Sequence, residues 1–125
     1  MMKFTHTDAW ILMGLPSNKI SISLLELIER CDALNHTIPT KKEIEIALTK
    51  GIQAGIVAQD GRNLRLTDEF LPMYEEVYKS KGGLFALSEN LLKKLNKLNI
   101  NQRTNSSVNL NDKEFKIAIR EYTNH

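Results

Sequence analysis

The chain alternates between segments whose apolar residues recur every three or four positions and short polar segments that separate them. The first apolar segment starts near Thr5 or Thr7 and ends before Pro16, which predicts one helix. After a turn, "KISIS" alternates Ile20 and Ile22 with polar residues, which predicts one short strand. The pattern therefore opens with a helix followed by a strand.

Two further helices are each predicted by a capping box and an apolar stripe. Ser23 and Glu26 have the spacing of a first capping box, and the stripe behind it is Leu24, Leu27, Ile28 and Cys31. Thr40 and Glu43 repeat the box, and the second stripe is Ile44, Ala47, Leu48, Gly51 and Ile52. The helix over 40–54 thus has an inward face and an outward one, the latter made of Lys42, Glu45, Ile46, Thr49, Lys50 and Gln53.

A β-hairpin is predicted directly after this helix. Gly55 has the place of a helix-ending glycine, and "IVAQ" and "NLRL" flank Asp60-Gly61, a dipeptide typical of hairpin turns. Gly51 is expected at a close approach between helices. Thr67 is expected to cap a further helix through Lys79, and Pro72 either kinks that helix or marks its first turn.

The C-terminal part is predicted to be helical with one interruption. After the flexible break "SKGG" a leucine stripe predicts a helix, and its members are Leu84, Leu87, Leu91, Leu95 and Leu98. Residues 99–111 are polar and predict a linker, and a short closing helix follows with Phe115, Ala118, Ile119 and Tyr122 on one side. This helix either docks on its own chain or pairs with another copy. We therefore divide the chain into a domain over 1–80 and a C-terminal helical extension over 81–125.

The element order over 7–80 resembles the winged helix-turn-helix family, and small bacterial MarR-like and PadR-like regulators in particular. The resemblance depends on that order and on the run "IPTKKEIEIAL", "GIV", "DG" and "LRLT" between Ile38 and Thr67. It implies a mostly α fold with a small β-hairpin. It also implies that the helix over 40–54 enters the major groove of double-stranded DNA, and that the hairpin over 56–66 touches the backbone or the minor groove.

The resemblance further implies which residues contact DNA: Thr40, Lys41, Lys42, Ile46, Thr49 and Lys50 on the helix, and Arg62 and Arg65 on the hairpin. Basic residues suit these places because neutralising phosphates releases condensed counterions, and the amides at a helix start can bind a phosphate. Glu45 lies on the same outward side, where it either accepts from a cytosine amino group or repels the backbone.

Charge and composition narrow the function classes. The formal net charge is +2, with nine basic and eleven acidic residues up to Ser80 and eight basic and four acidic residues after it. The basic extension, with Lys93, Lys94 and Lys97, is a possible source of positive charge for DNA binding. No apolar stretch approaches the roughly 20 residues of a membrane span, and no signal peptide is evident, so we expect a soluble, cytoplasmic protein.

Enzymatic or metal chemistry is not indicated by any motif. No phosphate-binding glycine loop, nucleophile motif or marked carboxylate pair is present, so we expect neither catalysis nor a cofactor. Cys31 is the single cysteine and lies on an apolar stripe, where a core role is expected. His36 lies in a loop without a third ligand in view.

The sequence therefore predicts a DNA-binding transcriptional regulator or a relative of one. An alternative is an adaptor that uses the same outward face, Ile46 included, to bind a protein partner, since winged helices serve both purposes. The C-terminal helices exceed what a minimal winged helix requires, and we expect them to form a homodimer. A dimer would place two helices about 34 Å apart, one turn of DNA, and read a palindrome.

Overall fold

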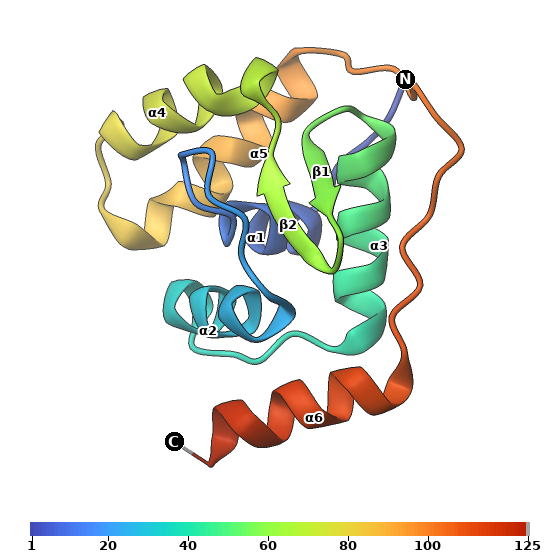
Figure 1. The fold of residues 1–125 in the computed structure, drawn as a ribbon. Helices are drawn as coiled ribbons and strands as arrows, with labels where there is room; N and C mark the ends of the chain where they lie inside the picture. Colours follow the sequence, from blue (N-terminus) through green and yellow to red (C-terminus); the bar gives the residue numbers. More distant parts are fainter. Residues whose placement is uncertain (125) are drawn as a thin grey trace.

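The structure, a computed structural model, describes residues 1–124, with Phe85 as backbone only. Within this range five α-helices and one antiparallel hairpin surround a sixth helix, α1 (His6–Met13), as Figure 1 shows. Nearly every residue of α1 is buried, with Ala9, Ile11 and Met13 fully so. A helix that is apolar on all sides is stable only inside a core, which explains its central position. The predicted class, mostly α with a small β-hairpin, is confirmed.

Three capping boxes start the first three helices. The two predicted boxes are present at Ser23, before α2 (Leu24–Asn35), and at Thr40, before α3 (Lys41–Gln53). A third, formed by Thr5 and Asp8, starts α1. In each box the cap hydroxyl accepts a hydrogen bond from the backbone amide three residues later, and the carboxylate of that later residue accepts one from the cap amide. Two backbone amides that have no partner inside the helix are thereby satisfied.

The predicted strand around Ile20 and Ile22 is reduced to one bridge. The Ile22 amide donates to the Leu64 carbonyl at 2.8 Å, and the Leu64 amide donates to the Ile22 carbonyl at 2.9 Å. Ile20 is 62% exposed, and its amide donates to the side chain of Asn18. The expected strand was too long, because a turn holds the chain before Ile20 and α2 begins immediately after Ser23.

The hairpin consists of β1 (Val57–Asp60) and β2 (Asn63–Leu66), with Val57 opposite Leu66 and Asp60 opposite Asn63. The expected Asp60-Gly61 turn is wrong by one residue, because Asp60 is part of the ladder and the turn is Gly61-Arg62. The φ angle of Gly61 is +63°, whereas that of Arg62 is negative. Glycine at the first turn position is typical of the type II′ turn, whose twist matches that of the strands.

Gly51 and Gly55 have the two roles expected of them. A Cβ on Gly51 would lie 2.6 Å from Val57 Cγ2 and 2.9 Å from Leu12 Cδ2, so α3 approaches α1 and β1 more closely than any larger residue allows. Gly55 has a φ of +80°, the left-handed conformation in which helices commonly end.

After the hairpin the chain forms a 3₁₀ turn at Asp68–Phe70 and then α4 (Leu71–Lys79), with Pro72 in its first turn. The side chain of Thr67 does not cap this helix as expected. Its hydroxyl donates to the Gly55 carbonyl at 2.6 Å and so joins the end of β2 to the end of α3.

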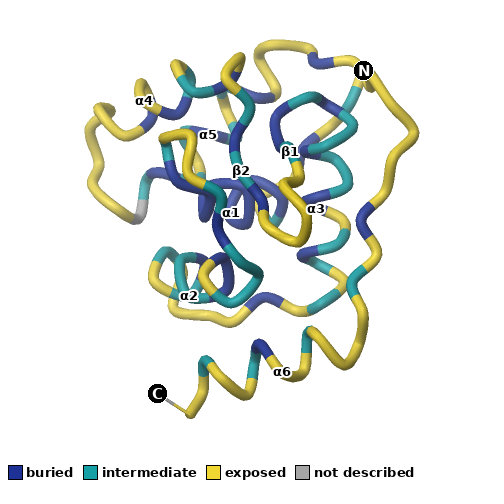
Figure 2. The backbone as a smooth tube through the Cα atoms, viewed as in Figure 1, coloured by how far each residue is buried: buried dark blue, intermediate teal, exposed yellow. Residues whose placement is uncertain are grey.

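The leucine stripe of the C-terminal part belongs to the same core as α1. After a second 3₁₀ turn at Leu84–Ala86 comes α5 (Leu87–Lys97), which buries Leu87, Leu91 and Leu95 against the rest of the protein. The two ends of the stripe are exposed, since Leu84 and Leu98 lie outside α5. Figure 2 shows the buried residues concentrated in α1 and in the inner sides of the surrounding elements.

The last helix, α6 (Asp112–Thr123), docks on α2 of its own chain, one of the two arrangements left open by the sequence. Its apolar side is turned toward α2, with Ala118 buried and the Tyr122 hydroxyl donating to the Asp32 carboxylate. The polar linker before it has no helix or strand, as predicted, and Figure 1 shows it passing along the outer side of α3. No helix of the described residues is long and apolar enough to cross a membrane.

Candidate nucleic-acid interface

The outward side of α3 has a row of polar side chains, which we call the α3 row: Lys41, Glu45, Thr49 and Gln53. These residues are four positions apart and therefore lie above one another along one side of the helix. The opposite side is buried, with Ile44, Ala47 and Leu48 fully inaccessible. The apolar stripe thus determines which face of α3 points away from the core.

The C-terminal tail, residues 101–124, covers the α3 row. The Arg103 amide donates to the Gln53 carbonyl at 2.7 Å, and the Gln53 amide group donates to the Ser106 carbonyl at 3.0 Å. The Val108 amide donates to Thr49 Oγ1 at 2.9 Å. The Leu110 amide donates to the Glu45 carboxylate at 2.6 Å, and Lys41 pairs with Asp112 at 2.8 Å. The tail therefore runs antiparallel to α3 and engages every member of the row.

The regular spacing of these contacts has a geometrical cause. Two residues of extended chain advance about 6.6 Å, and four residues of an α-helix advance about 6 Å. Every second tail residue from Ser106 to Asp112 therefore meets every fourth residue of α3. Val108 is buried and Leu110 half-buried, whereas the alternate residues Ser107 and Asn109 are exposed, as expected for an extended segment with one side against a surface.

Basic residues from α3 and from the hairpin converge on the start of α6. Lys41 Nζ lies 2.8 Å from Asp112 Oδ1, and Arg62 at the hairpin tip lies 2.9 Å from Glu114 Oε1. Asp112 and Glu114 are two residues apart on one helix, so their Cα atoms are separated by about 5 Å. One cation of α3 and one of the hairpin thus each hold a carboxylate in the first turn of α6.

The Lys41 to Asp112 contact favours the charged form of both groups. The hydrogen bond from Lys41 lowers the pKa of Asp112 below its ordinary value, and the same bond raises the pKa of Lys41. The negative charge of Glu45, whose carboxylate lies 3.9 Å from Lys41 Nζ, also raises the pKa of Lys41. The contact is therefore an ion pair at neutral pH.

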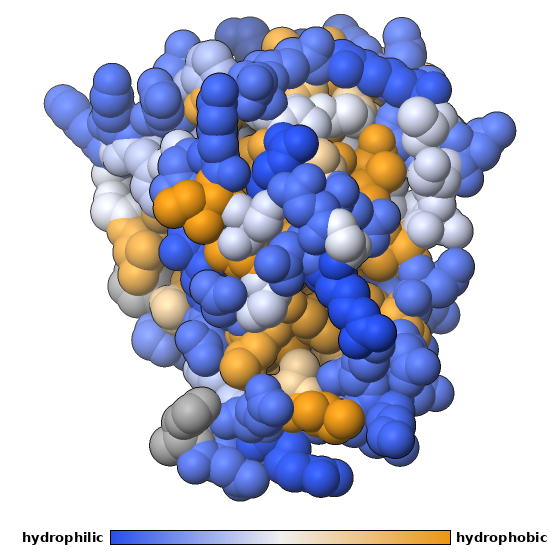
Figure 3. Space-filling model, in the orientation of Figure 1, coloured by the Kyte–Doolittle hydropathy of each residue, from blue (hydrophilic) through white to orange (hydrophobic). Residues whose placement is uncertain are grey.

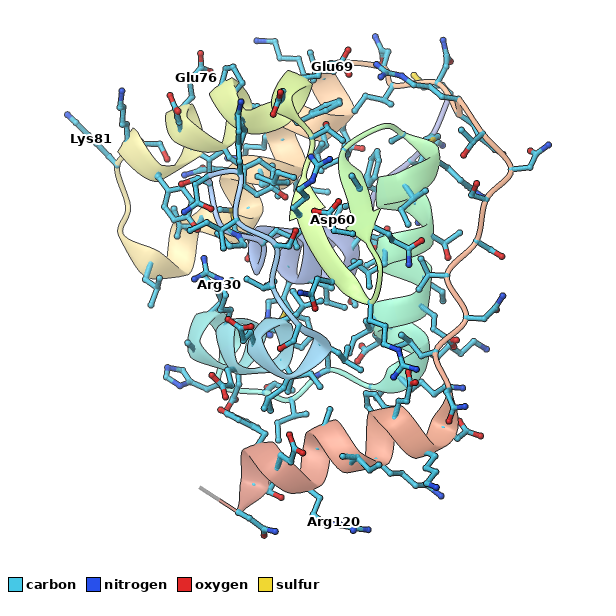
Figure 4. All side chains as sticks on the ribbon, in the orientation of Figure 1. Arg30, Asp60, Glu69, Glu76, Lys81 and Arg120 are labelled. Atoms are coloured by element: carbon cyan, nitrogen blue, oxygen red, sulfur yellow. The ribbon has the colours of Figure 1, made fainter. Side chains whose placement is uncertain are left out.

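Two of the predicted DNA contacts are engaged within the folded domain. Lys50 points back toward α1, where its ammonium contacts the buried Asp8 carboxylate at 2.6 Å and the Lys3 carbonyl at 3.1 Å. Arg65 pairs with Asp60 at 2.9 Å across the hairpin. Asp60, labelled in Figure 4 on the hairpin, also accepts from Ser21, and this hydrogen bond lowers the pKa of Asp60.

The other residues predicted to contact DNA differ in their exposure to solvent and in their partners within the protein. Lys42 is exposed and makes no ion pair within residues 1–124, and Ile46 is 44% exposed. The Thr40 hydroxyl accepts the Glu43 amide as a helix cap, and Thr49 accepts from the tail. The tail therefore contacts Lys41, Thr49 and Arg62, although the Arg62 side chain stays 87% exposed. Lys42 and Ile46 are exposed.

The residues that the sequence did not single out are those of the tail itself. Nothing in the linker pattern indicates that Val108, Leu110 or Asp112 lies on α3, because the contacts join residues some 60 positions apart. The only available sign was the alternation of Val108 and Leu110 with polar residues, which is too short to predict an extended segment. Asp112 and Glu114 read simply as acidic residues at a helix start.

A cleft of about 820 Å³ lies between α4, α5 and residues 97–103, and it adjoins the start of the tail at Arg103. Two ion pairs lie on its walls: Lys94 with Glu76 at 2.8 Å, and Arg103 with Glu69 at 2.7 Å. Figure 4 labels both glutamates, on the side of the molecule with α4. The described residues hold no cluster of three potential metal ligands.

Comparison of the chain with protein-family models, with curated proteins and with solved structures gives no match. The functional interpretation therefore depends on the fold and on the contacts described above.

Proposed function

We propose that this chain is a DNA-binding protein of the winged helix-turn-helix type, a transcriptional regulator or a relative of one. The order of elements supports this proposal, with α1, the Ile22 bridge, α2, α3 and the hairpin following one another. In this arrangement α3 would enter the major groove, and the hairpin would contact the backbone. Fold similarity alone does not determine function, so the site has to support the proposal independently.

The observation that carries the proposal is the convergence of Lys41 and Arg62 on two anionic groups. The two cations come from the two elements that a winged helix would apply to DNA, and they already bind two carboxylates close together. Phosphate groups are anions, as carboxylates are, and arginine and lysine are the side chains that usually bind them. Lys42 lies next to Lys41 and is exposed, so it would extend this surface.

A specific observation also favours the alternative, an adaptor that binds a protein partner. The α3 row binds an extended backbone through side chains, as a peptide-binding surface does, and Ile46 beside it is exposed. On this alternative an acidic, extended peptide would replace the tail. We place the adaptor second because it requires a peptide whose carboxylates are spaced to meet both Lys41 and Arg62. The phosphates of any DNA duplex could meet these two cations. The predicted homodimer stays a prediction, since α5 and α6 bury their apolar sides in their own chain.

The test is a fluorescence-anisotropy titration of labelled, mixed-sequence duplex DNA at low and at moderate salt. The test variant carries Lys41→Ala, Lys42→Ala, Arg62→Ala and Arg65→Ala. We expect the affinity of the wild type to fall steeply with salt, and the slope in the variant to be flatter by about one for each lost phosphate contact.

A variant with the same loss of charge at exposed lysines outside the predicted DNA contacts serves as the control: Lys3→Ala, Lys19→Ala, Lys79→Ala and Lys81→Ala. Figure 4 places Lys81 on the opposite side of the molecule from α3. This control should retain the wild-type salt dependence. Equal losses in both variants would mean that net charge rather than the α3 surface binds DNA. If none of these proteins binds at low salt, and the Asp112→Asn, Glu114→Gln variant does not bind either, the adaptor becomes the better proposal.

A further inference from the structure

We propose that the C-terminal tail is autoinhibitory: it occupies the DNA-binding surface of α3 and the hairpin, and DNA binds only after the tail has left. This inference rests on the proposed function and concerns the regulation of the same site. The tail contacts that carry it extend from Arg103 to Glu114 and engage both elements.

The first reason is steric. A recognition helix reads base edges with the side chains of its outward face, and the major groove is about 12 Å wide, enough for one helix. The tail lies on that face over the whole length of α3, from Gln53 to Lys41. A second layer of polypeptide on α3 would collide with the groove walls, so the tail and DNA exclude each other.

The second reason is that the tail carries negative charge, as the phosphate backbone of DNA does. The carboxylates of Asp112 and Glu114 lie on Lys41 and Arg62, the two cations for which we propose phosphate contacts. Each cation has its charge satisfied by one anion at a time. The tail therefore competes with DNA electrostatically as well as sterically, through side chains that act as phosphate substitutes.

The third reason is that the tail can leave without unfolding the core. Residues 101–107 are exposed throughout, and Val108 and Ala118 are the buried side chains of the tail among the residues described. The other apolar side chains that the tail packs against the core are only partly buried: Leu110, Phe115, Ile119 and Tyr122. The core around α1 contains many fully buried side chains from α2, α3, α4 and α5 instead. Segments with few buried apolar contacts open at a small fraction of the global free energy of unfolding.

Figure 3 shows the surface around the boundary between α6 and the body of the protein. On the face shown, hydrophilic residues cover most of the surface, and apolar residues are visible along the boundary between α6 and the body of the protein.

If the tail has to leave before DNA binds, the apparent affinity for DNA equals the intrinsic affinity multiplied by the fraction of molecules with an open tail. Any change that weakens the tail contacts without touching α3 should therefore increase DNA affinity.

The decisive variant combines Asp112→Asn and Glu114→Gln in the full chain. Both changes keep the shape of the side chain and remove the charges that hold Lys41 and Arg62. In the anisotropy titration described above, at low salt, we expect this variant to bind labelled duplex DNA roughly fivefold more tightly than the wild type, the effect of two exposed ion pairs. Thermal unfolding of both proteins verifies that the core is intact.

The matched control combines Glu75→Gln and Glu89→Gln, both outside the tail. It changes the net charge by the same amount, at exposed positions that make no ion pair in the described part of the chain. Because general attraction to DNA increases equally in the two double variants, the difference between them reports the tail alone. We expect the control to bind DNA within about twofold of the wild type.

A tail that cannot leave provides the converse test. The Val108 amide lies 2.9 Å from Thr49 Oγ1, so Thr49→Cys with Val108→Cys places two thiols at the centre of the tail contact. The native Cys31 is buried and does not compete for this bond. We expect the oxidised protein to lose DNA binding and the same sample to regain it after reduction with dithiothreitol.

The outcomes separate the two proposals. If the wild type binds DNA and the Asp112, Glu114 variant binds no better than its control, or if the oxidised protein still binds, the tail is not autoinhibitory and the proposed function stands. If the variant binds DNA and the wild type does not, both are supported. If no protein binds, the charge-released variant and the reduced double cysteine included, the proposed function fails and the autoinhibitory role fails with it.

Discussion

Asp8 is buried to 2% exposure and has two partners that the sequence does not connect. Its carboxylate accepts the Thr5 amide at 2.9 Å as part of the capping box of α1, and it accepts from Lys50 at 2.6 Å. A buried carboxylate without partners is costly, so α3 contributes Lys50 to the stability of α1. One of the basic residues expected on DNA is thus explained by the core.

Cys31 provides a residue-scale prediction about pH. Burial raises the pKa of the Cys31 thiol from 9.0 to about 12, while the charge of Arg30 lowers it by a smaller amount. The unfolded chain therefore loses this proton first, and the contribution of Cys31 to stability decreases as the pH rises from 9.0 toward about 12. Between pH 8 and pH 10 we expect the free energy of unfolding to fall by about 1.4 kcal/mol from this group.

Urea unfolding of the wild type and of Cys31→Ala at the two pH values measures the effect. The alanine variant starts from a lower stability because of its cavity, so the comparison concerns the change with pH alone. The wild type should lose more than the variant by about 1.4 kcal/mol. Parallel losses in both proteins would show that the thiol does not contribute in this range.

At the scale of elements, Thr67 at the junction between the hairpin and α4 has a different role from the helix cap that its sequence position predicts. Thr67 precedes a helix and has the sequence properties of a cap. In the structure a 3₁₀ turn and Pro72 start α4, and the Thr67 hydroxyl donates to Gly55 twelve positions earlier. The hairpin is thereby held at both ends to α3, which determines where Arg62 lies.

Substitutions at Thr67 distinguish a cap from this connection. Aspartate is a good cap but cannot donate a hydrogen bond when ionised, and its charge would face the Gly55 carbonyl. We therefore expect Thr67→Asp to lower the free energy of unfolding by about 1 to 3 kcal/mol, and Thr67→Ser to lower it by less than about 1 kcal/mol. Thermal unfolding of the two variants measures this. Greater stability of the aspartate variant would identify a cap instead.

At the scale of the whole molecule, the last quarter of the chain closes over the surface formed by the first part. The α3 row, the hairpin tip and α2 are three separate elements, and the tail contacts all of them through Thr49, Arg62 and Asp32. Most of these contacts are polar and at least partly exposed. Their strength therefore depends on pH and salt far more than that of the apolar core does.

The tail is accordingly expected to detach before the core unfolds when the pH is lowered. The hydrogen bond from Lys41 lowers the pKa of Asp112 below 3.8, so this interaction is present above 3.8 and is lost as the pH falls through the lowered value. Hydrogen exchange at a series of pH values from 6 downward measures it: the Val108 and Leu110 amides should lose protection at a higher pH than the amides of α1 do. Simultaneous loss in both regions would contradict a separately opening tail.

The sequence by itself determined the local structure of most of the chain. Capping boxes at Ser23 and Thr40, the stripes of α2 and α3, and the glycines at 51 and 55 all depend on residues a few positions apart, and each agrees with the structure. The short strand and the hairpin turn were misplaced by a residue or more, because neighbouring turns and α2 compete for the same backbone groups.

Only the tertiary structure decided which surfaces remain available. That Lys50 contacts Asp8, that Thr67 bonds Gly55 and that the tail covers the α3 row are contacts between residues 12 to 65 positions apart. Local propensity and periodicity contain no information about such pairs, because the free energy that selects them arises when complementary donors, acceptors and charges meet in the packed molecule. The outward face of α3 was therefore predictable, whereas its coverage by the chain's own C-terminus was not.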